Sequence, residues 1–389
     1  MMGNARCVVG VSVRNPFIYG QIVGPDAFCG RVTEQADLAR AMENGERLFL
    51  FSERRMGKTS LVLRAMDRLP PDRYLKLYVD LWPTEGPASF ARRLAQAFGD
   101  ALGGETESRL QAFKRYVSRL QPMMSLDESG RPTFSLGLSD ARDPAPDLED
   151  MLAAPARAAA DRGLRSVIVL DEFQRIFDYE NDLVERTLRS SIQAQPDSAY
   201  VFLGSRKHLL QSMLYDQSRP LYRSGGHYPL GPIPTEQWCP FIQKRFVDAG
   251  RMIDDAVIGH ICALTGGHPF YTQHLCHATW ELCEVGDSAS ALLVEEALGL
   301  LLAREQHAYS ALWESMTLNQ RRLVMGLSLE GERPQVSSAA FFSRYGLSSA
   351  SSVQRAAEAL ITRDILDRDN GSYLVSDRFF RLWVQREEA

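Results

Sequence analysis

Two short stretches of the 389-residue chain carry side chains suited to one kind of chemistry, Gly57-Lys58-Thr59 and Asp171-Glu172. The lysine supplies a fixed positive charge, and the hydroxyl and the first carboxylate supply oxygen ligands of the kind that Mg²⁺ prefers. The second carboxylate can accept a proton from an attacking water molecule as a general base. Together these residue types indicate a site for a phosphorylated substrate that binds with a metal ion.

The first stretch lies between a predicted strand and a predicted helix. The apolar run 47–51 is typical of a buried strand, and the apolar spacing within 58–66 predicts a helix. Backbone N–H groups at a helix start attract phosphate, and Gly57 lets the backbone approach it closely. We therefore predict a phosphate-binding loop in which Lys58 reaches the β- and γ-phosphates and Thr59 ligates Mg²⁺. The competing interpretation is a chance Gly-Lys-Thr in a surface loop.

The phosphate-loop pattern departs from its usual form at one position, because Ser52 stands where the pattern has glycine. A serine must adopt whatever dihedral angles the turn requires, so we expect the loop to be strained or differently shaped. The residues predicted to contact the nucleotide here are Glu53, Arg54, Arg55, Met56, Gly57, Lys58, Thr59 and Ser60.

The second stretch follows the uniformly apolar run 167–170, which is typical of a strand buried on both faces of a parallel sheet. Ligands of such sheets bind at the carboxyl ends of the strands, where the phosphate loop also begins. We predict that Asp171 holds Mg²⁺ through water or Thr59 and that Glu172 orients or deprotonates the attacking water. The alternative is a strand that simply ends in solvated acids.

Strands and helices alternate over the first two thirds of the chain. Further strands are predicted over 74–81, 199–204 and 228–233, with helices between them, which indicates a three-layer α/β fold around a parallel sheet. Ser205 follows the strand 199–204. Its hydroxyl could touch the γ-phosphate or its water, or it could cap the next helix, and the sequence leaves both open.

The last third of the chain has a different pattern. Helices are predicted over 253–265, 269–284 and 289–303, which indicates a small helical lid, and then over 307–316, 318–328, 337–345 and 351–362. Asp369-Asn370-Gly371 between two apolar runs predicts a β-hairpin, so the end of the chain is typical of a winged helix. The predicted domains are a leader (1–46), a nucleotide-binding core (47–250), the lid (251–305) and the winged helix (306–389).

Composition narrows the class of protein. Apolar residues make up 45% and charged residues 24%, which is ordinary for a globular chain. A net charge of −5 argues against a global basic field for nucleic acid or anionic membranes. Six cysteines without a CxxC pair indicate reduced thiols, and no apolar run approaches ~20 residues. We therefore predict a cytoplasmic protein that neither is secreted nor spans a membrane.

Short segments along nearly the whole chain, apart from 103–147, match one pattern. They are Asn15-Pro-Phe-Ile-Tyr19 with Phe28-Cys-Gly-Arg31, Glu53-Arg-Arg-Met-Gly-Lys-Thr-Ser-Leu61, Val169-Leu-Asp-Glu-Phe-Gln174, Gly204-Ser205, Pro220-Leu-Tyr-Arg223, Gly267-His-Pro-Phe-Tyr271 and Tyr373-Leu-Val-Ser-Asp-Arg-Phe-Phe-Arg-Leu-Trp383. On these residues the chain resembles the archaeal-ATPase-type P-loop ATPases within the signal-transduction ATPases with numerous domains (STAND). That family is similar to the AAA+ and origin-recognition ATPases.

The resemblance implies ATP and Mg²⁺ bound between the sheet and the lid. It implies Phe28 and Arg31 on the adenine side and Pro269 near the base or sugar. It also implies that ATP switches the lid and winged helix between two arrangements, often with self-assembly. An arginine finger that reaches a neighbour's γ-phosphate could come from Arg206, Arg219 or Arg223, although for any single one of them an ordinary surface arginine is the favoured interpretation.

Three functions fit these residues. The first is a slow ATPase switch whose nucleotide state controls assembly or partner binding, with Glu172, Ser205 and Arg223 as catalytic residues. The second is a DNA-binding ATPase for transposition, replication or transcription control. Its winged helix would hold duplex DNA, although 306–389 contains ten arginines, no lysine and ten acidic residues. The third is a non-catalytic nucleotide-holding scaffold, which the presence of Glu172 disfavours.

Overall fold

The fold is described from a computed structural model of the chain. It describes residues 14–103, 113–117, 121–126, 132–137, 145–205, 210, 213–330, 335–369 and 371–387. These fall into two compact units, one of residues 31–231 and one that combines residues up to 30 with residues 232–389. Each unit is described separately below.

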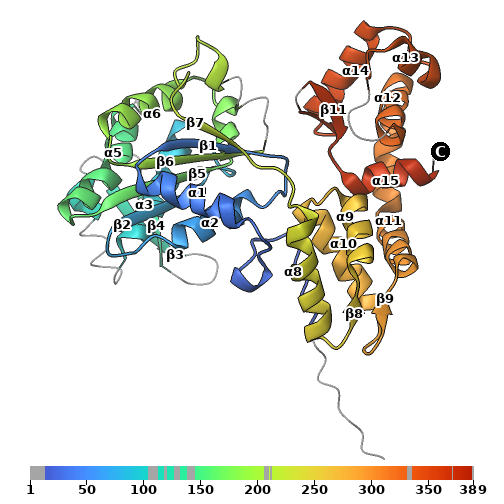
Figure 1. Ribbon diagram of the computed structural model, residues 1–389. Helices are drawn as coiled ribbons and strands as arrows, with labels where there is room; N and C mark the ends of the chain where they lie inside the picture. Colours follow the sequence, from blue (N-terminus) through green and yellow to red (C-terminus); the bar gives the residue numbers. More distant parts are fainter. Residues whose placement is uncertain are drawn as a thin grey trace, which may run out of the picture. The chain divides into compact units, whose positions relative to one another are not determined.

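A five-stranded parallel sheet forms the centre of the first unit (Figure 1). The strand order is β2 (Tyr74–Asp80), β5 (Arg165–Asp171), β6 (Ala199–Gly204), β1 (Arg47–Phe51) and β7 (Gly226–Pro229). All four pairings are parallel, so the carboxyl ends of the strands share one edge of the sheet. The central strands β5, β6 and β1 are mostly apolar and buried, as is usual where helices cover both faces of a parallel sheet. The predicted parallel P-loop fold is confirmed.

Helices form the outer layers of this sheet. On one face, Phe49, Ile168 and Phe202 share a core with the apolar sides of α3 (Pro87–Leu102), α5 (Ala145–Asp161) and α6 (Leu183–Ala194). On the other face, α1 (Val32–Glu43) packs against β6 and against α2 (Lys58–Asp67). Strand side chains alternate between the two faces, which is how one strand contributes to both layers.

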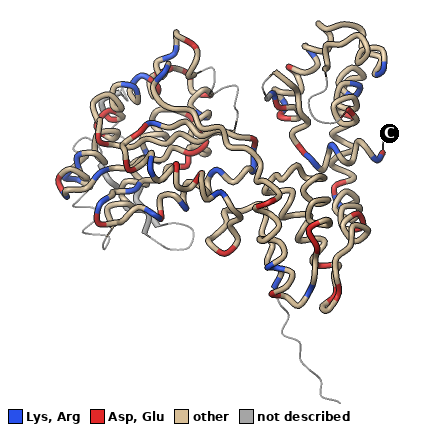
Figure 2. Tube along the Cα trace, in the orientation of Figure 1, with Lys and Arg blue, Asp and Glu red and all other residues tan. Residues whose placement is uncertain are grey.

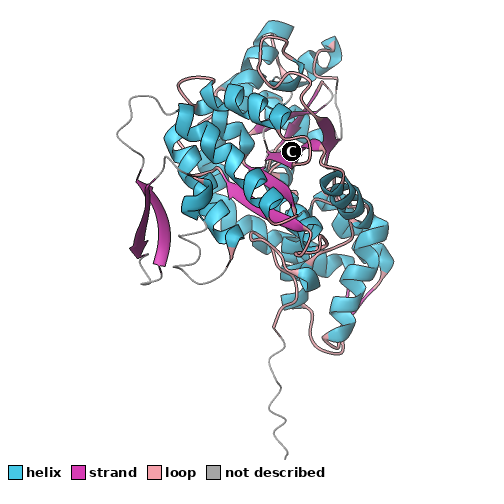
Figure 3. Ribbon diagram, turned by 90° about the vertical axis from the view of Figure 1, so that its left-hand side faces the viewer, coloured by secondary structure: helices cyan, strands magenta, loops and turns pink. Residues whose placement is uncertain are grey.

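A hairpin and a 3₁₀ helix complete the first unit. The strands β3 (Gln121–Leu126) and β4 (Pro132–Gly137) pair antiparallel and form a separate ribbon in Figure 3. The alternating run 133–138 falls mostly within β4. The 3₁₀ helix η2 (Phe173–Asp178) follows β5 directly. Between residue 103 and β3, only residues 113–117 are described.

The second unit is mainly helical and shares one apolar core. Its helices are η1 (Pro25–Ala27), α8 (Thr235–Asp248), α9 (Asp255–Thr265), α10 (Pro269–Leu282), α11 (Ala291–Glu314), α12 (Leu318–Leu329), α13 (Ala339–Tyr345), α14 (Ala350–Thr362) and α15 (Arg378–Glu387). The short strands are β8 (Met252–Ile253) paired with β9 (Ser288–Ala289), and β10 (Leu366–Asp369) paired with β11 (Ser372–Val375). The predicted hairpin near the end of the chain is β10–β11, and Gly371 takes the left-handed conformation (φ 84°) that its turn requires.

Three details differ from the sequence predictions. The helix break predicted between 303 and 307 is wrong, because α11 runs through it without a glycine or proline to interrupt it. The fifth strand lies at Gly226–Pro229, earlier than the predicted 228–233. The predicted leader is divided, since residues 14–30 cluster with the second unit and residues 31–46 with the first. Among the described helices, none is both long and apolar enough to cross a membrane.

Candidate active site

The phosphate loop connects β1 to α2 at the carboxyl edge of the sheet. Its left-handed residues are Arg55 (φ 58°) and Gly57 (φ 83°), whereas Ser52 is not among the residues with positive φ. The strain expected at Ser52 is therefore absent, because the sharp turns lie later in the loop. Ser52 is fully buried, and its hydroxyl donates a hydrogen bond to the carbonyl of Glu53 (2.9 Å).

Lys58 is the first residue of α2, and its ammonium group lies inside the loop. Its Nζ donates hydrogen bonds to Ser52 Oγ (3.0 Å) and to the Glu53 carbonyl (3.1 Å). The serine that replaces glycine in the pattern thus contacts the lysine directly. Gly57 caps α2 without a side chain, so the dipole of the helix start acts on the loop itself. This arrangement concentrates positive potential where a phosphate would bind.

Asp171 and Thr59 are brought together from β5 and α2. The Thr59 hydroxyl donates a hydrogen bond to Asp171 Oδ2 at 2.7 Å. Sequence reasoning missed a second donor, since the Tyr78 hydroxyl contacts the same oxygen at 2.6 Å. Tyr78 lies on β2, where it pairs with Val169 of β5, so only the strand register could have revealed it. Burial and the neighbouring Asp171 carboxylate raise the pKa of Tyr78, which keeps its hydroxyl protonated as a donor.

The oxygens of Thr59 and Asp171 suit a magnesium ion whose other ligands are water molecules and substrate phosphates. Mg²⁺ takes hard oxygen ligands and usually keeps several waters, with one or two protein ligands and substrate phosphates completing its shell. Among the described residues no group of three or more His, Cys, Asp or Glu side chains could hold a metal. A two-oxygen site beside a phosphate loop therefore suits a metal that arrives with its nucleotide.

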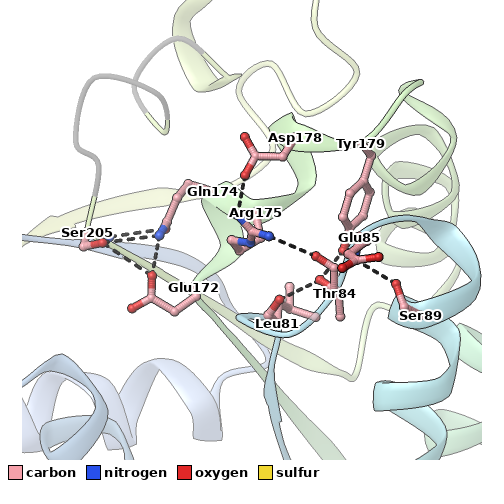
Figure 4. A network of polar contacts seen from close by, with 10 residues as sticks. All are labelled: Leu81, Thr84, Glu85, Ser89, Glu172, Gln174, Arg175, Asp178, Tyr179 and Ser205. Atoms are coloured by element: carbon pink, nitrogen blue, oxygen red, sulfur yellow. Dashed lines mark hydrogen bonds and ion pairs between the residues drawn. The ribbon is translucent and has the colours of Figure 1, made fainter. Parts of the chain in front are cut away.

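Glu172, Gln174 and Ser205 form a polar cluster at the same edge (Figure 4). Gln174 Nε2 donates hydrogen bonds to Glu172 Oε2 and to Ser205 Oγ (3.3 Å). The Ser205 hydroxyl donates to Glu172 Oε2 at 3.4 Å. Glu172 is left-handed (φ 54°), and its amide donates to Asp171 Oδ1 at 2.8 Å. Sequence reasoning placed Glu172 and Ser205 at this edge but did not single out Gln174.

The 3₁₀ helix η2 is anchored on its other side by contacts that Figure 4 also shows. Arg175 donates to the carbonyl of Thr84 (3.3 Å) and pairs with Asp178 at 2.6 Å. The hydroxyls of Thr84 and Tyr179 are 2.5 Å apart, and burial raises the pKa of Tyr179. These contacts tie η2 to the loop that follows β2, so its position does not depend on β5 alone.

Arg31 supports the phosphate loop from within the protein. Its side chain is 2% exposed, and its Nη2 donates to the carbonyls of Met56 (3.2 Å) and Gly231 (2.8 Å). Arg31 itself is left-handed (φ 56°) and caps α1. Sequence reasoning had expected an adenine contact from Arg31, and that role stays a prediction.

The remaining predicted residues are placed as follows. Arg219 forms an ion pair with the buried Glu185 at 2.5 Å, which makes it a structural partner within the chain. Arg223 is exposed and left-handed (φ 49°), with its guanidinium over the ring of Tyr222. Arg206 lies outside the described residues. Phe28 and Pro269 belong to the helical unit, so their roles at the base also stay predictions.

Comparison with known proteins identifies two domains in the chain and the fold of the whole. Residues 42–212 match a family model described as an AAA domain, and residues 307–386 match one described as a probable winged helix domain. No curated protein matches the chain. A Walker-type ATPase of Pyrococcus abyssi is 14% identical, with a TM-score of 0.64 over 95% of this chain and 99% of that one. The ORC2 protein of Aeropyrum pernix, solved as ADPNP–ADP complexes, is 13% identical, with a TM-score of 0.53 over 97% and 99%.

At such low identities the solved structures establish a shared fold, while the family models identify the two domains in the sequence itself. The AAA match spans the loop after β1 and the acidic pair that ends β5. The chain therefore carries an AAA domain of the P-loop ATPase fold in residues 42–212, followed by a winged helix domain in residues 307–386.

Proposed function

We propose that the protein is a Mg²⁺-dependent ATPase that hydrolyses ATP slowly and uses its nucleotide state to control assembly or partner binding. The observation that carries this proposal is the meeting of Thr59 and Asp171, 2.7 Å apart, at the edge where Lys58 and Glu172 also lie. A chain that only held nucleotide would not need a second carboxylate beside the metal ligand.

Each residue at this edge has a role that follows from its chemistry. Lys58 would neutralise the β- and γ-phosphates, while Thr59 and Asp171 would hold the metal directly or through water. Bound Mg²⁺ would supply further neutralisation of phosphate charge. Glu172 would accept the proton of the attacking water. The Ser205 hydroxyl lies beside Glu172 and could orient that water or the γ-phosphate.

Slow turnover is expected because the two described candidates for an arginine finger, Arg219 and Arg223, have other partners in this chain. Arg219 is already paired with Glu185, at 2.5 Å. Arg223 is exposed on the loop before β7 and is the better candidate for reaching a γ-phosphate bound to a second copy. An arginine supplied in this way accelerates related reactions by about 10³–10⁵-fold. Assembly would then set the rate of hydrolysis.

Arg31 supports the switch part of the proposal. The chain passes between its two units at residues 30–31 and again at 231–232. Arg31 begins the ATPase unit, and it donates to Gly231 at the end of that unit as well as to Met56 in the phosphate loop. A movement of the loop on phosphate binding would therefore act on both connections at once.

The DNA-binding alternative has weaker support. Figure 2 shows basic and acidic residues interspersed along the winged helix, which agrees with equal numbers of both in 306–389. Several of its arginines are used internally. Arg321 donates to the Trp313 carbonyl, Arg322 to the Gly346 carbonyl and Arg344 to Glu330. Because phosphate affinity grows with the number of neutralised phosphates, a strong non-specific grip on DNA is not expected.

Steady-state ATP turnover of the purified protein, with and without duplex DNA and Mg²⁺, tests the proposal. Lys58→Ala should lose nucleotide binding, and Glu172→Gln should bind ATP but hydrolyse it at least about 100-fold more slowly. Turnover that depends on protein concentration and ignores DNA supports the switch. If DNA raised the ATP turnover of the parent protein but not that of either variant, the DNA-binding ATPase would be favoured. If the parent hydrolysed ATP no faster than Glu172→Gln, the scaffold interpretation would replace both.

A further inference from the structure

The side-chain amide of Gln174 is held in a single orientation. Gln174 is 4% exposed, and its Oε1 accepts a hydrogen bond from the backbone amide of Ser205 at 3.3 Å. A backbone N–H can only donate, so the oxygen of the Gln174 amide must face it and the NH₂ group must face the other way. The NH₂ group then meets Glu172 Oε2 and Ser205 Oγ.

The packing around Gln174 allows little movement. A Cβ atom on Gly204 would come within 2.6 Å of Gln174 Oε1, so the glutamine lies directly against the backbone at the end of β6. On its N-terminal side, Phe173 is fully buried and packs against Phe49 and Phe202. The backbone of Gln174 is thus anchored in the core, and its amide is anchored on β6.

The two oxygens of Glu172 have different surroundings. Oε2 receives hydrogen bonds from both Gln174 and Ser205, while Oε1 accepts none from the described residues. The carboxylate is therefore fixed through one oxygen and leaves the other available to accept a proton. The left-handed backbone of Glu172, a conformation that non-glycine residues rarely adopt, is the turn that brings Gln174 back beside the carboxylate.

We propose that Gln174 is a positioning residue for hydrolysis, which fixes the Glu172 carboxylate against the end of β6 so that its second oxygen faces the attacking water. This inference rests on the proposed ATPase function and adds to it a residue that acts through Glu172 without touching ATP. A displaced general base contributes much less to the rate of hydrolysis. Removing the Gln174 amide should therefore slow the chemical step by about 10- to 100-fold.

The test compares binding with chemistry in two variants. Gln174→Leu removes both hydrogen-bonding groups at similar volume, and Gln174→Glu keeps the acceptor for Ser205 but cannot donate to Glu172. For each, affinity for a fluorescent ATP analogue and single-turnover hydrolysis of radiolabelled ATP are measured. We expect affinity within about twofold of the parent and hydrolysis about 10- to 100-fold slower.

A matched control separates positioning from general damage to a packed glutamine. Gln195 also uses both ends of its amide, donating to the Leu152 carbonyl (3.1 Å) and accepting from the Tyr200 hydroxyl (2.7 Å), but it precedes β6 at the opposite edge of the sheet. Gln195→Leu should lower the melting temperature without changing the single-turnover rate. Equal rate losses in Gln195→Leu and Gln174→Leu would overturn the proposal.

A double-mutant comparison asks whether Gln174 acts through Glu172. In a Glu172→Gln background the general base is already lost, so adding Gln174→Leu should change the residual rate by less than about threefold. The same 10- to 100-fold loss in that background would assign Gln174 to a different role and refute the proposal. If the parent hydrolyses ATP, Glu172→Gln does not, and both Gln174 variants match the parent, the positioning role fails while the ATPase function stands.

Discussion

Replacing Tyr78 by phenylalanine should weaken Mg²⁺-dependent nucleotide binding. The Tyr78 and Thr59 hydroxyls both donate to Asp171 Oδ2, at 2.6 and 2.7 Å. If Thr59 ligated a metal ion, Tyr78 would be the donor that continued to orient the carboxylate. Tyr78 would then act on the metal without contacting it.

The size of the effect follows from the charge on the acceptor. A hydrogen bond to a charged group contributes about 1.5–3 kcal/mol, and loss of such a partner of a metal ligand typically costs 10–100-fold in affinity. Because Asp171 is expected to hold Mg²⁺ partly through water, we expect a loss of affinity at the lower end of the 10–100-fold range. Tyr78→Phe should raise the Mg²⁺ concentration for half-maximal binding about tenfold, which corresponds to about 1.4 kcal/mol.

The assay is a Mg²⁺ titration of fluorescent ADP binding, read by anisotropy. Tyr74→Phe is the matched control, because Tyr74 is a buried tyrosine at the amino end of the same strand, where it pairs with Arg165. Its half-maximal Mg²⁺ concentration should equal that of the parent. A Tyr78→Phe titration within twofold of the parent, or an equal shift in Tyr74→Phe, would refute the reasoning.

Three further outcomes are expected. Gly204→Ala should lower the melting temperature through about 1–3 kcal/mol of overpacking, while Gly231→Ala, where an added Cβ meets nothing within 4 Å, should not. Arg31→Lys should destabilise the ATPase unit by about 1–3 kcal/mol, because lysine lacks the planar guanidinium that contacts both carbonyls through Nη2 and Glu34 through Nη1, and the exposed Arg40→Lys should be neutral in the same melt. Burial and Asp37 raise the pKa of Tyr228 to about 12. The folded state keeps the Tyr228 proton to a higher pH than the unfolded state does. The contribution of Tyr228 to the free energy of unfolding is therefore complete below pH 10 and is lost from about pH 10 to 12. In urea unfolding over that pH range, the free energy of unfolding should fall less steeply with pH in Tyr228→Phe than in the parent.

The nucleotide motifs could be predicted because local sequence determines them. A strand, a short loop with Gly57 and a helix beginning at Lys58 are set by contiguous residues, and the parallel sheet follows from uniformly apolar strands. Thr59 and Asp171 were placed together from sequence alone because parallel strands end at one edge. The sequence also shows that Ser52 replaces a glycine, but the backbone strain expected there is wrong. The dihedral angles depend on the whole turn, and the left-handed residues are Arg55 and Gly57.

Side chains that act across strands could not be predicted in this way. Tyr78 reaches Asp171 because β2 and β5 are neighbours in a particular register, and many tyrosines occupy strands for packing alone. Gln174 lies only two residues from Glu172, yet its orientation depends on the Ser205 amide from a different strand. Arg31 resembles an adenine-side residue in its sequence motif, whereas its contacts in the structure include the carbonyls of Met56 and Gly231.

Residue types and their spacing are enough to predict the phosphate loop, the acidic pair, the parallel α/β core and the hairpin of the winged helix. Each depends on residue types and spacing within one segment or on the rule that parallel strands end together. Only the tertiary structure decided which polar groups support those residues. Hydrogen bonds from Tyr78, Gln174 and Arg31 join elements far apart in the chain, and their geometry is fixed by strand order and packing that no local pattern encodes.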